Sequence, residues 1–260
     1  MVMDATAEDK NSIPTNLRPL LVLEAIATAG VPVTPTEVNE GLGLPKPTIH
    51  RLFATLEDEG FIQREIDGRG YTPGLRMRTL STGILSSLRV RTARIAILSR
   101  LAEEIGETCN IALPDRDAMI YLDRIETKWP LRIQLPVGTR VPFYCTASGK
   151  LYLSSLDDRH LESYLNATTM TAHTEQTLTS PQALHQEISQ IRKQGFSTDN
   201  EEFMDDMIAV AVPIVESNGR LLSTLSFHAP VQRFPLDQAI TFLPVMRTAA
   251  AELSNLISTD

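Results

Sequence analysis

The clearest pattern of apolar and polar positions lies in residues 44–60. Apolar side chains recur there at the spacing of one helix face, while the other face is small, polar or basic. Pro45 and Pro47 suit a first turn, and Gly60 suits a helix end. The segment predicts a short helix whose exposed side chains can approach base edges in the DNA major groove. An ordinary amphipathic surface helix has the same pattern, so the flanking segments decide.

Two further helices are predicted before this segment. Residues 16–29 carry an apolar face, and Gly30 ends the pattern. Thr34 and Glu37 have the spacing of a capping box, which starts a second short helix before residues 44–60. A short helix, a turn with glycine and a second helix make a helix-turn-helix. The apolar face of the first helix is expected to comprise Leu17, Leu20, Leu21, Leu23 and Ile26.

A β-hairpin is predicted directly after these helices. FIQREI alternates apolar and polar residues, DGRG is a turn, and YTP returns as the second strand. Such a hairpin is a wing, and Arg64 and Arg69 would bring positive charge towards a phosphate backbone. Three helices and a basic wing within residues 14–73 favour DNA binding over a purely structural helix.

A long helical pattern follows over residues 74–105, with a break expected near Arg89. Its first half carries an apolar seam without an evident neighbour in the same domain. Such a seam suits pairing with a second copy of the chain, and packing on its own domain is the alternative. The seam comprises Leu75, Leu80, Ile84, Leu85 and Leu88.

The pattern changes from helical to strand-like after Glu107. Runs rich in Ile, Leu and Val predict strands and are bounded by turn residues, and longer amphipathic segments predict helices. Strands in runs with helices on the flanks indicate an α+β domain of the sensor type. The expected strands are 108–114, 118–126, 131–138, 208–215 and 220–227, and the expected helices are 146–154, 157–165, 181–194 and 236–257.

Composition changes this picture only slightly. The 260 residues allow one large domain or two small ones, and the formal net charge of −8 argues against nucleic-acid binding. The charge is uneven, because residues 41–78 hold six basic and five acidic side chains, whereas residues 199–206 hold five acids and no base. An acidic chain can still bind DNA when its basic groups share one face.

The cysteines and the N-terminus indicate a cytoplasmic protein. Cys109 and Cys145 are far apart, which suits a reducing compartment and provides neither a disulfide framework nor a zinc motif. Residues 1–13 are polar and acidic, so we expect a disordered tail and not a signal peptide. No apolar run is long enough to predict a membrane span, and we expect no membrane partner.

Four segments in the same order resemble the IclR family of bacterial transcriptional regulators over residues 14–257. GLGLPKPTIHRLFATLEDEGFIQRE is similar to the winged helix-turn-helix of the family, and YTPGLRMRTLSTGIL to the start of its linker helix. VGTRVPFYCTASGKLYLS and QGFSTDNEEFMDDMIAVAVPI are similar to two segments of its effector domain.

The resemblance implies a one-component regulator whose affinity for DNA is controlled by a small molecule. A winged helix-turn-helix would occupy residues 14–73, a linker and dimerisation helix 74–89, and a GAF-like effector-binding domain 90–260. The expected partners are double-stranded operator DNA, a small organic acid or aromatic effector, and a second copy of the chain in a dimer or a dimer of dimers. Repression is favoured over activation.

The candidate site residues fall into two groups. Those for DNA are Lys46, Thr48, His50, Arg51, Thr55, Arg64 and Arg69. Those for the effector, by resemblance, are Val141, Ala147, Ser148, Asp199, Met207, Ala209, Ser226 and His228.

The residues themselves are compatible with an effector site. Small residues at 147–149 open a helix, so backbone N–H groups there can meet an anion. Ser226 and His228 alternate on one strand face, and a cationic His228 could pair with a ligand carboxylate. A buried histidine satisfied by protein groups is the alternative. The aromatic residues Trp129, Phe143 and Tyr144 suit either an aromatic ligand or the core.

Two positions depart from the family pattern. Pro47 stands where a small polar residue is usual, so one backbone donor to DNA is absent. Asp206 stands where glycine is common, and the local turn is expected to differ.

Catalytic and metal motifs are weak. Ser148-Gly149-Lys150 does not complete a phosphate loop, and no nucleophile elbow is present. The acids of 199–206 lack a calcium-loop pattern and are expected to form a solvated loop. We therefore expect no metal, no cofactor and no catalytic residue. A small-molecule-processing enzyme, or a ligand-binding scaffold without DNA binding, is the alternative.

Overall fold

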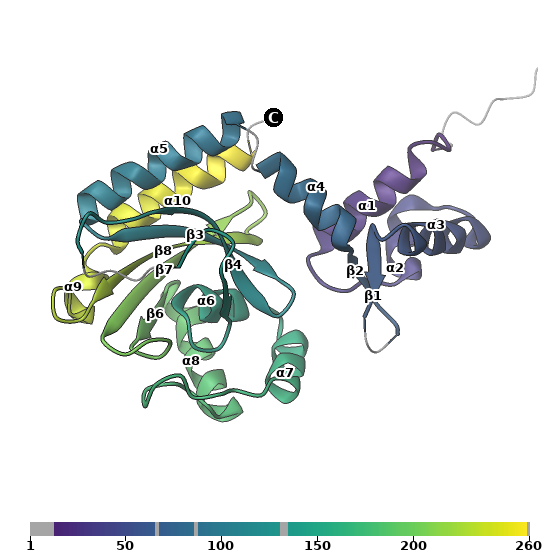
Figure 1. Ribbon diagram of the computed structural model, residues 1–260. Helices are drawn as coiled ribbons and strands as arrows, with labels where there is room; N and C mark the ends of the chain where they lie inside the picture. Colours follow the sequence, from purple (N-terminus) through teal and green to yellow (C-terminus); the bar gives the residue numbers. More distant parts are fainter. Residues whose placement is uncertain (1–12, 66–67, 86–87, 131–134, 259–260) are drawn as a thin grey trace, which may run out of the picture. The chain divides into compact units, whose positions relative to one another are not determined.

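The computed structural model describes residues 13–65, 68–85, 88–130 and 135–258 (Figure 1). It divides into two compact units, one within residues 1–87 and one within 88–260, and each is described by itself. The expected N-terminal tail lies almost entirely outside the described residues.

The first unit has three helices, a two-stranded hairpin and a fourth helix. The predicted capping box is present, because the Thr34 side chain accepts from the Glu37 N–H and Glu37 accepts from the Thr34 N–H. The hairpin is antiparallel, with Ile62 opposite Pro73. The elements are α1 (Arg18–Ala29), α2 (Pro35–Leu42), α3 (Lys46–Asp58), β1 (Ile62–Arg64), β2 (Tyr71–Pro73) and α4 (Leu75–Leu85).

The core of this unit is built on the apolar face of α3. Ile49, Phe53 and Leu56 are buried, and the Phe53 and Tyr71 rings meet edge to face at 4.9 Å between centroids. The expected apolar face of α1 was partly wrong. The helix buries Val22 and Ile26, whereas Leu17 precedes the helix and Leu20 points away from the core, so both are exposed.

The second unit is a six-stranded antiparallel sheet with helices on both faces. The strand order is β5-β4-β3-β8-β7-β6. Figure 1 shows α5 and α10 side by side on one face, and α6 and α8 on the other. The elements are α5 (Leu88–Ile105), β3 (Thr108–Asp115), β4 (Ala118–Ile125), β5 (Arg140–Pro142), α6 (Ala147–Ser155), α7 (Asp158–Ala167), α8 (Pro181–Gln194), β6 (Ser197–Asn200), β7 (Met207–Val215), β8 (Leu221–Pro230), α9 (Leu236–Ile240) and α10 (Leu243–Ser258).

Strand alternation gives the sheet two different faces. Ile208, Val210 and Val212 of β7 pack in the core with α5 and α10, whereas Ala209 and Ala211 face α6 and α8. The alanines are small, so the second face has room for polar side chains from the neighbouring strands. The predicted effector residues lie on this second face.

Several element boundaries differ from the predictions. The closing helix is two helices, α9 and α10, and β6 was not predicted as a strand. Of the strand expected at 131–138, residues 131–134 lie outside the described residues and 135–138 are not extended; β5 begins at Arg140. The predicted break near Arg89 stays a prediction, because residues 86–87, between the last residue given for α4 and the first given for α5, lie outside the described residues.

Candidate nucleic-acid interface and effector site

The face of α3 opposite its core residues is polar and accessible. Lys46, His50, Arg51 and Thr55 are exposed, and Thr48 is half-buried. Pro47 also lies exposed in the first turn. The structure therefore places the five predicted residues on α3, outside the face that its core residues occupy.

Arg64 of the wing is held against the end of α3. Its guanidinium donates to both carboxylate oxygens of Glu57, at 3.2 and 3.0 Å, and lies 4.7 Å from the centroid of the Tyr71 ring. The hydrogen bond from Arg64 lowers the pKa of Glu57. Arg64 therefore also positions the wing on the helix, a role that the sequence did not indicate. Arg69 is exposed beyond it in the same hairpin.

Arg76 makes a similar contact from α4. It pairs with the Glu59 carboxylate at 2.6 Å, and its guanidinium lies 4.4 Å from the centroid of the Phe61 ring. Glu57 and Glu59, at the end of α3, are thus both paired with arginine, which locally offsets their negative charge.

Strand pairing brings most of the predicted effector residues together. Asp199, Ala209 and His228 lie opposite one another across β6, β7 and β8. Ser226 is on the same face of β8 as His228, and it accepts a 3.3 Å hydrogen bond from the Ser148 hydroxyl of α6. The buried members are Val141, Ala147, Ser148, Asp199, Ala209, Ser226 and His228, while Met207 is half-buried.

The start of α6 is fixed closely against this face. The Thr146 hydroxyl caps the helix by accepting from the Gly149 N–H at 3.1 Å. Gly149 is required here, because a Cβ at this position would overlap the backbone of Phe143. The start of α6 is therefore held close to the backbone of Phe143, and its Ser148 reaches Ser226 of the sheet.

His228 is not the cation that we had considered. Burial, and then the charge of Arg124, lowers the pKa of its imidazole to about 3. Its Nδ1 lies 2.7 Å from the Asn110 amide nitrogen, and its Nε2 lies 3.5 Å from the Tyr121 hydroxyl. The neutral, protein-bonded alternative is the one that the structure favours, so His228 does not supply positive charge to a ligand.

Asp199 and Glu202 correct the expectation of a solvated acidic loop. Both are buried, and Asp199 accepts from the Glu202 and Phe203 N–H groups at 2.7 and 3.3 Å. Burial, and then the charge of Glu202, raises the pKa of Asp199 to about 7. Glu202 is in turn paired with the buried Lys150, which also donates to Glu187 at 3.1 Å.

The turn at Asp206 keeps the geometry that glycine would give. Asp206 has a φ of 63°, in the left-handed region, and accepts a 2.7 Å hydrogen bond from the Gln232 amide. The expectation that this turn differs from that of the family stays a prediction. Aspartate is among the residues that tolerate this region.

Three site residues were missed in the sequence. Asn110, Tyr121 and Arg124 lie on β3 and β4 and are linked to His228 by hydrogen bonds. Strand alternation in the sequence could have placed these three residues on one face only if the register of β3 and β4 were known. That register shifts between Ile111 and Ala112, which the sequence does not indicate.

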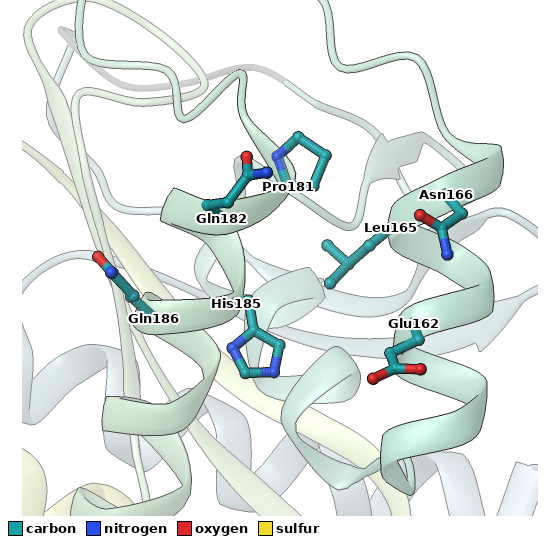
Figure 2. A pocket seen from close by; sticks show the side chains of 7 residues that line it. All are labelled: Glu162, Leu165, Asn166, Pro181, Gln182, His185 and Gln186. Atoms are coloured by element: carbon teal, nitrogen blue, oxygen red, sulfur yellow. The ribbon is translucent and has the colours of Figure 1, made fainter.

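A separate cleft of about 440 Å³ lies between α7 and α8 (Figure 2). Glu162 and His185 face one another across it, and no predicted effector residue contributes to it. Its lining comprises Glu162, Leu165, Asn166, Pro181, Gln182, His185 and Gln186.

Two searches of the described residues bear on alternative classes of protein. No helix among them is both long and apolar enough to span a bilayer. No group of three or more His, Cys, Asp or Glu side chains in the same part of the chain is arranged to hold a metal ion.

Comparison with known proteins agrees with this arrangement. Residues 17–65 match the IclR helix-turn-helix domain, and residues 82–255 match the C-terminal domain of bacterial IclR transcriptional regulators. A probable transcriptional regulator, SauR of Cupriavidus necator, is 36% identical over 237 residues, which cover 91% of this chain and 94% of the relative. The transcriptional repressor IclR of Escherichia coli is 29% identical over 252 residues, covering 96% and 92%.

A solved structure extends the agreement to the fold. The IclR protein of Thermotoga maritima aligns with a TM-score of 0.63 at 26% identity, covering 94% of this chain and 99% of that one. The two domain matches together span most of the sequence, and each falls on a unit with the expected architecture. The chain therefore belongs to the IclR family of bacterial transcriptional regulators, with a helix-turn-helix domain and an effector-binding domain.

Proposed function

We propose that this regulator reads operator DNA with the exposed face of α3 and contacts the phosphate backbone with its wing. The observation that carries the proposal is the surface of α3, where Lys46, His50 and Arg51 stand exposed without a large apolar side chain among them. An arginine that contacts guanine contributes to base discrimination, whereas a lysine at the helix start contacts phosphate.

The test is fluorescence anisotropy with DNA from upstream of the protein's own gene. Arg51→Ala should weaken specific binding about tenfold or more and relax site preference. Arg159→Ala is the matched control, because Arg159 is also exposed on a helix but belongs to the second unit. Unchanged affinity and preference in Arg51→Ala would refute the placement of this helix on DNA.

The same proposal includes pairing of two chains through α4. Leu80 and Ile84, one helical turn apart, are 59% and 61% exposed, so they form an apolar stripe that a second copy could cover. Leu80→Glu should shift the sedimentation of the full chain towards the monomer and weaken operator binding, whereas Ser81→Glu on the same helix should not. A sedimentation profile unchanged by Leu80→Glu would contradict pairing at this stripe.

We further propose that a small organic effector binds beneath α6, and that it releases the protein from DNA. The support is the convergence of the α6 N-terminus with buried polar groups of three strands, including Ser226 and Asp199. Repression is favoured because one relative is a named repressor. Titration of the protein–DNA complex with carboxylic acids tests this, and a complex that no acid weakens would argue against release.

A further inference from the structure

A series of buried hydrogen bonds runs from Arg124 of β4 to His228, which is one of the predicted effector residues. The Arg124 guanidinium donates to Asn110 Oδ1 at 2.7 Å, and Asn110 Nδ2 lies 2.7 Å from His228 Nδ1. His228 Nε2 then lies 3.5 Å from the Tyr121 hydroxyl. All four side chains are almost inaccessible to water.

The guanidinium of Arg124 determines which atom donates and which accepts in each hydrogen bond of this series. A guanidinium has only donors, so the Asn110 oxygen must face Arg124 and its NH₂ group must face His228. His228 Nδ1 therefore accepts and carries no proton. A neutral imidazole holds its one proton on the other nitrogen, so Nε2 is a donor.

The donor at Nε2 is only weakly used by the protein. A separation of 3.5 Å from the Tyr121 oxygen is longer than a normal hydrogen bond. Because Nε2–H would donate to Tyr121, the phenol proton is directed elsewhere. Burial raises the pKa of Tyr121, so this phenol stays protonated. His228 and Tyr121 thus offer two uncharged donors to an acceptor atom placed between or beside them.

We propose that Arg124 and Asn110 are positioning residues that hold His228 as its Nε2–H tautomer and so select an effector with an acceptor oxygen. The selection of an effector rests on the function proposed above. The class of ligand is an organic acid, with one carboxylate oxygen at His228 and Tyr121. A ligand that offers only donors at this point cannot bond to His228 Nε2, because accepting its proton would require the other tautomer, which the Asn110 amide opposes, and it is therefore disfavoured.

The tautomer is measured on the full-length protein without ligand. Long-range ¹H–¹⁵N spectra distinguish protonated from unprotonated ring nitrogens, and loss of one signal set in His228→Gln assigns His228 among the five histidines. We expect an unprotonated Nδ1 and a protonated Nε2. The opposite pattern, or a doubly protonated ring at neutral pH, in the wild-type protein would overturn the proposal.

Asn110→Asp tests the positioning role with almost no change in shape. A carboxylate can only accept, so it keeps the contact with Arg124 but requires a proton on His228 Nδ1. We expect the tautomer to reverse or the ring to become doubly protonated. Asn166→Asp, on the exposed surface of α7, adds the same charge and should leave the spectrum unchanged. A His228 pattern unaltered by Asn110→Asp refutes the role of Asn110.

Ligand selection is tested by calorimetry with benzoate and benzylamine. The wild type should bind benzoate and reject benzylamine, and Asn110→Asp should weaken benzoate about tenfold or more. His228→Leu, which can neither accept from Asn110 nor donate onward, should lose binding. Equal binding of both probes overturns the selection. Binding of neither counts against an effector site beneath α6, while the spectra still decide the tautomer.

Discussion

The protonation of Asp199, one of the predicted effector residues, makes the stability of the second unit depend on pH. Its folded pKa of about 7 lies above the ordinary value of 3.8, chiefly because of burial and then because of Glu202. Backbone N–H groups and Lys150 act in the opposite direction. The folded state therefore holds this proton more tightly than the unfolded chain. The stability that results is complete below about pH 4 and is lost as the pH rises through about 7.

Asp199→Asn removes this titration and preserves the local hydrogen bonds. Asparagine Oδ1 can still accept from the Glu202 and Phe203 N–H groups. Each pH unit between the unfolded and folded pKa changes the free energy of unfolding by about 1.4 kcal/mol. Relative to the wild type, the variant should therefore gain roughly 2 to 3 kcal/mol between pH 5 and pH 8.

The assay is urea denaturation at both pH values, followed by tryptophan fluorescence. Trp129 is the single tryptophan and belongs to the second unit, so its signal reports unfolding of that unit. Protein concentration must be constant, because self-association would add to the apparent stability. Asp205→Asn, an exposed acid of the same turn, is the control and should show no such gain. A difference between Asp199→Asn and wild type that is equal at both pH values would refute the reasoning.

Other predictions concern packing and charge. Gly149→Ala should lower the free energy of unfolding of the second unit by about 1–3 kcal/mol, because its Cβ overlaps backbone, while Gly83→Ala in α4, where a Cβ meets nothing, should be neutral or stabilising in thermal denaturation. Lys150→Met should destabilise by roughly 3–5 kcal/mol in the same urea assay, and Glu202→Gln in that background should restore part of the loss by removing the unpaired buried charge. Arg64→Ala should change stability little, because Arg64 is exposed, but should reduce the salt dependence of DNA binding by about one phosphate contact. A salt slope equal to wild type would exclude Arg64 from the DNA contact.

The helix-turn-helix was predictable because its signals are local. The capping box at Thr34 and the helical spacing through Phe53 each involve residues within one or two turns of the chain. The short β6 was not, because Ser197–Asn200 has little apolar alternation and is held by pairing with β7. The strand β6 depends on its pairing with β7, and no pattern within these four residues predicts it.

The chemistry of the predicted effector residues could likewise be predicted only in part from the sequence. Ser226 and His228 share a strand face, and their alternation is visible in the sequence. Asn110 lies 118 positions from His228 along the chain, and only the sheet order β3–β8 brings the two together. The pKa of a histidine depends on such distant neighbours and on burial, which is why the sequence left both a cationic and a neutral His228 open.

Charge position, not net charge, decides how this acidic chain can approach DNA. Glu57 and Glu59 are two of the acidic residues that make the first unit less basic and so count against DNA binding. Both are paired with arginines of neighbouring elements. In the second unit Asp199 is held partly protonated near neutral pH by its burial, so the formal count overstates its charge. The net charge of the whole sequence therefore does not describe the local charge at α3, and we propose that a second copy of the chain supplies the further DNA contacts that this face needs.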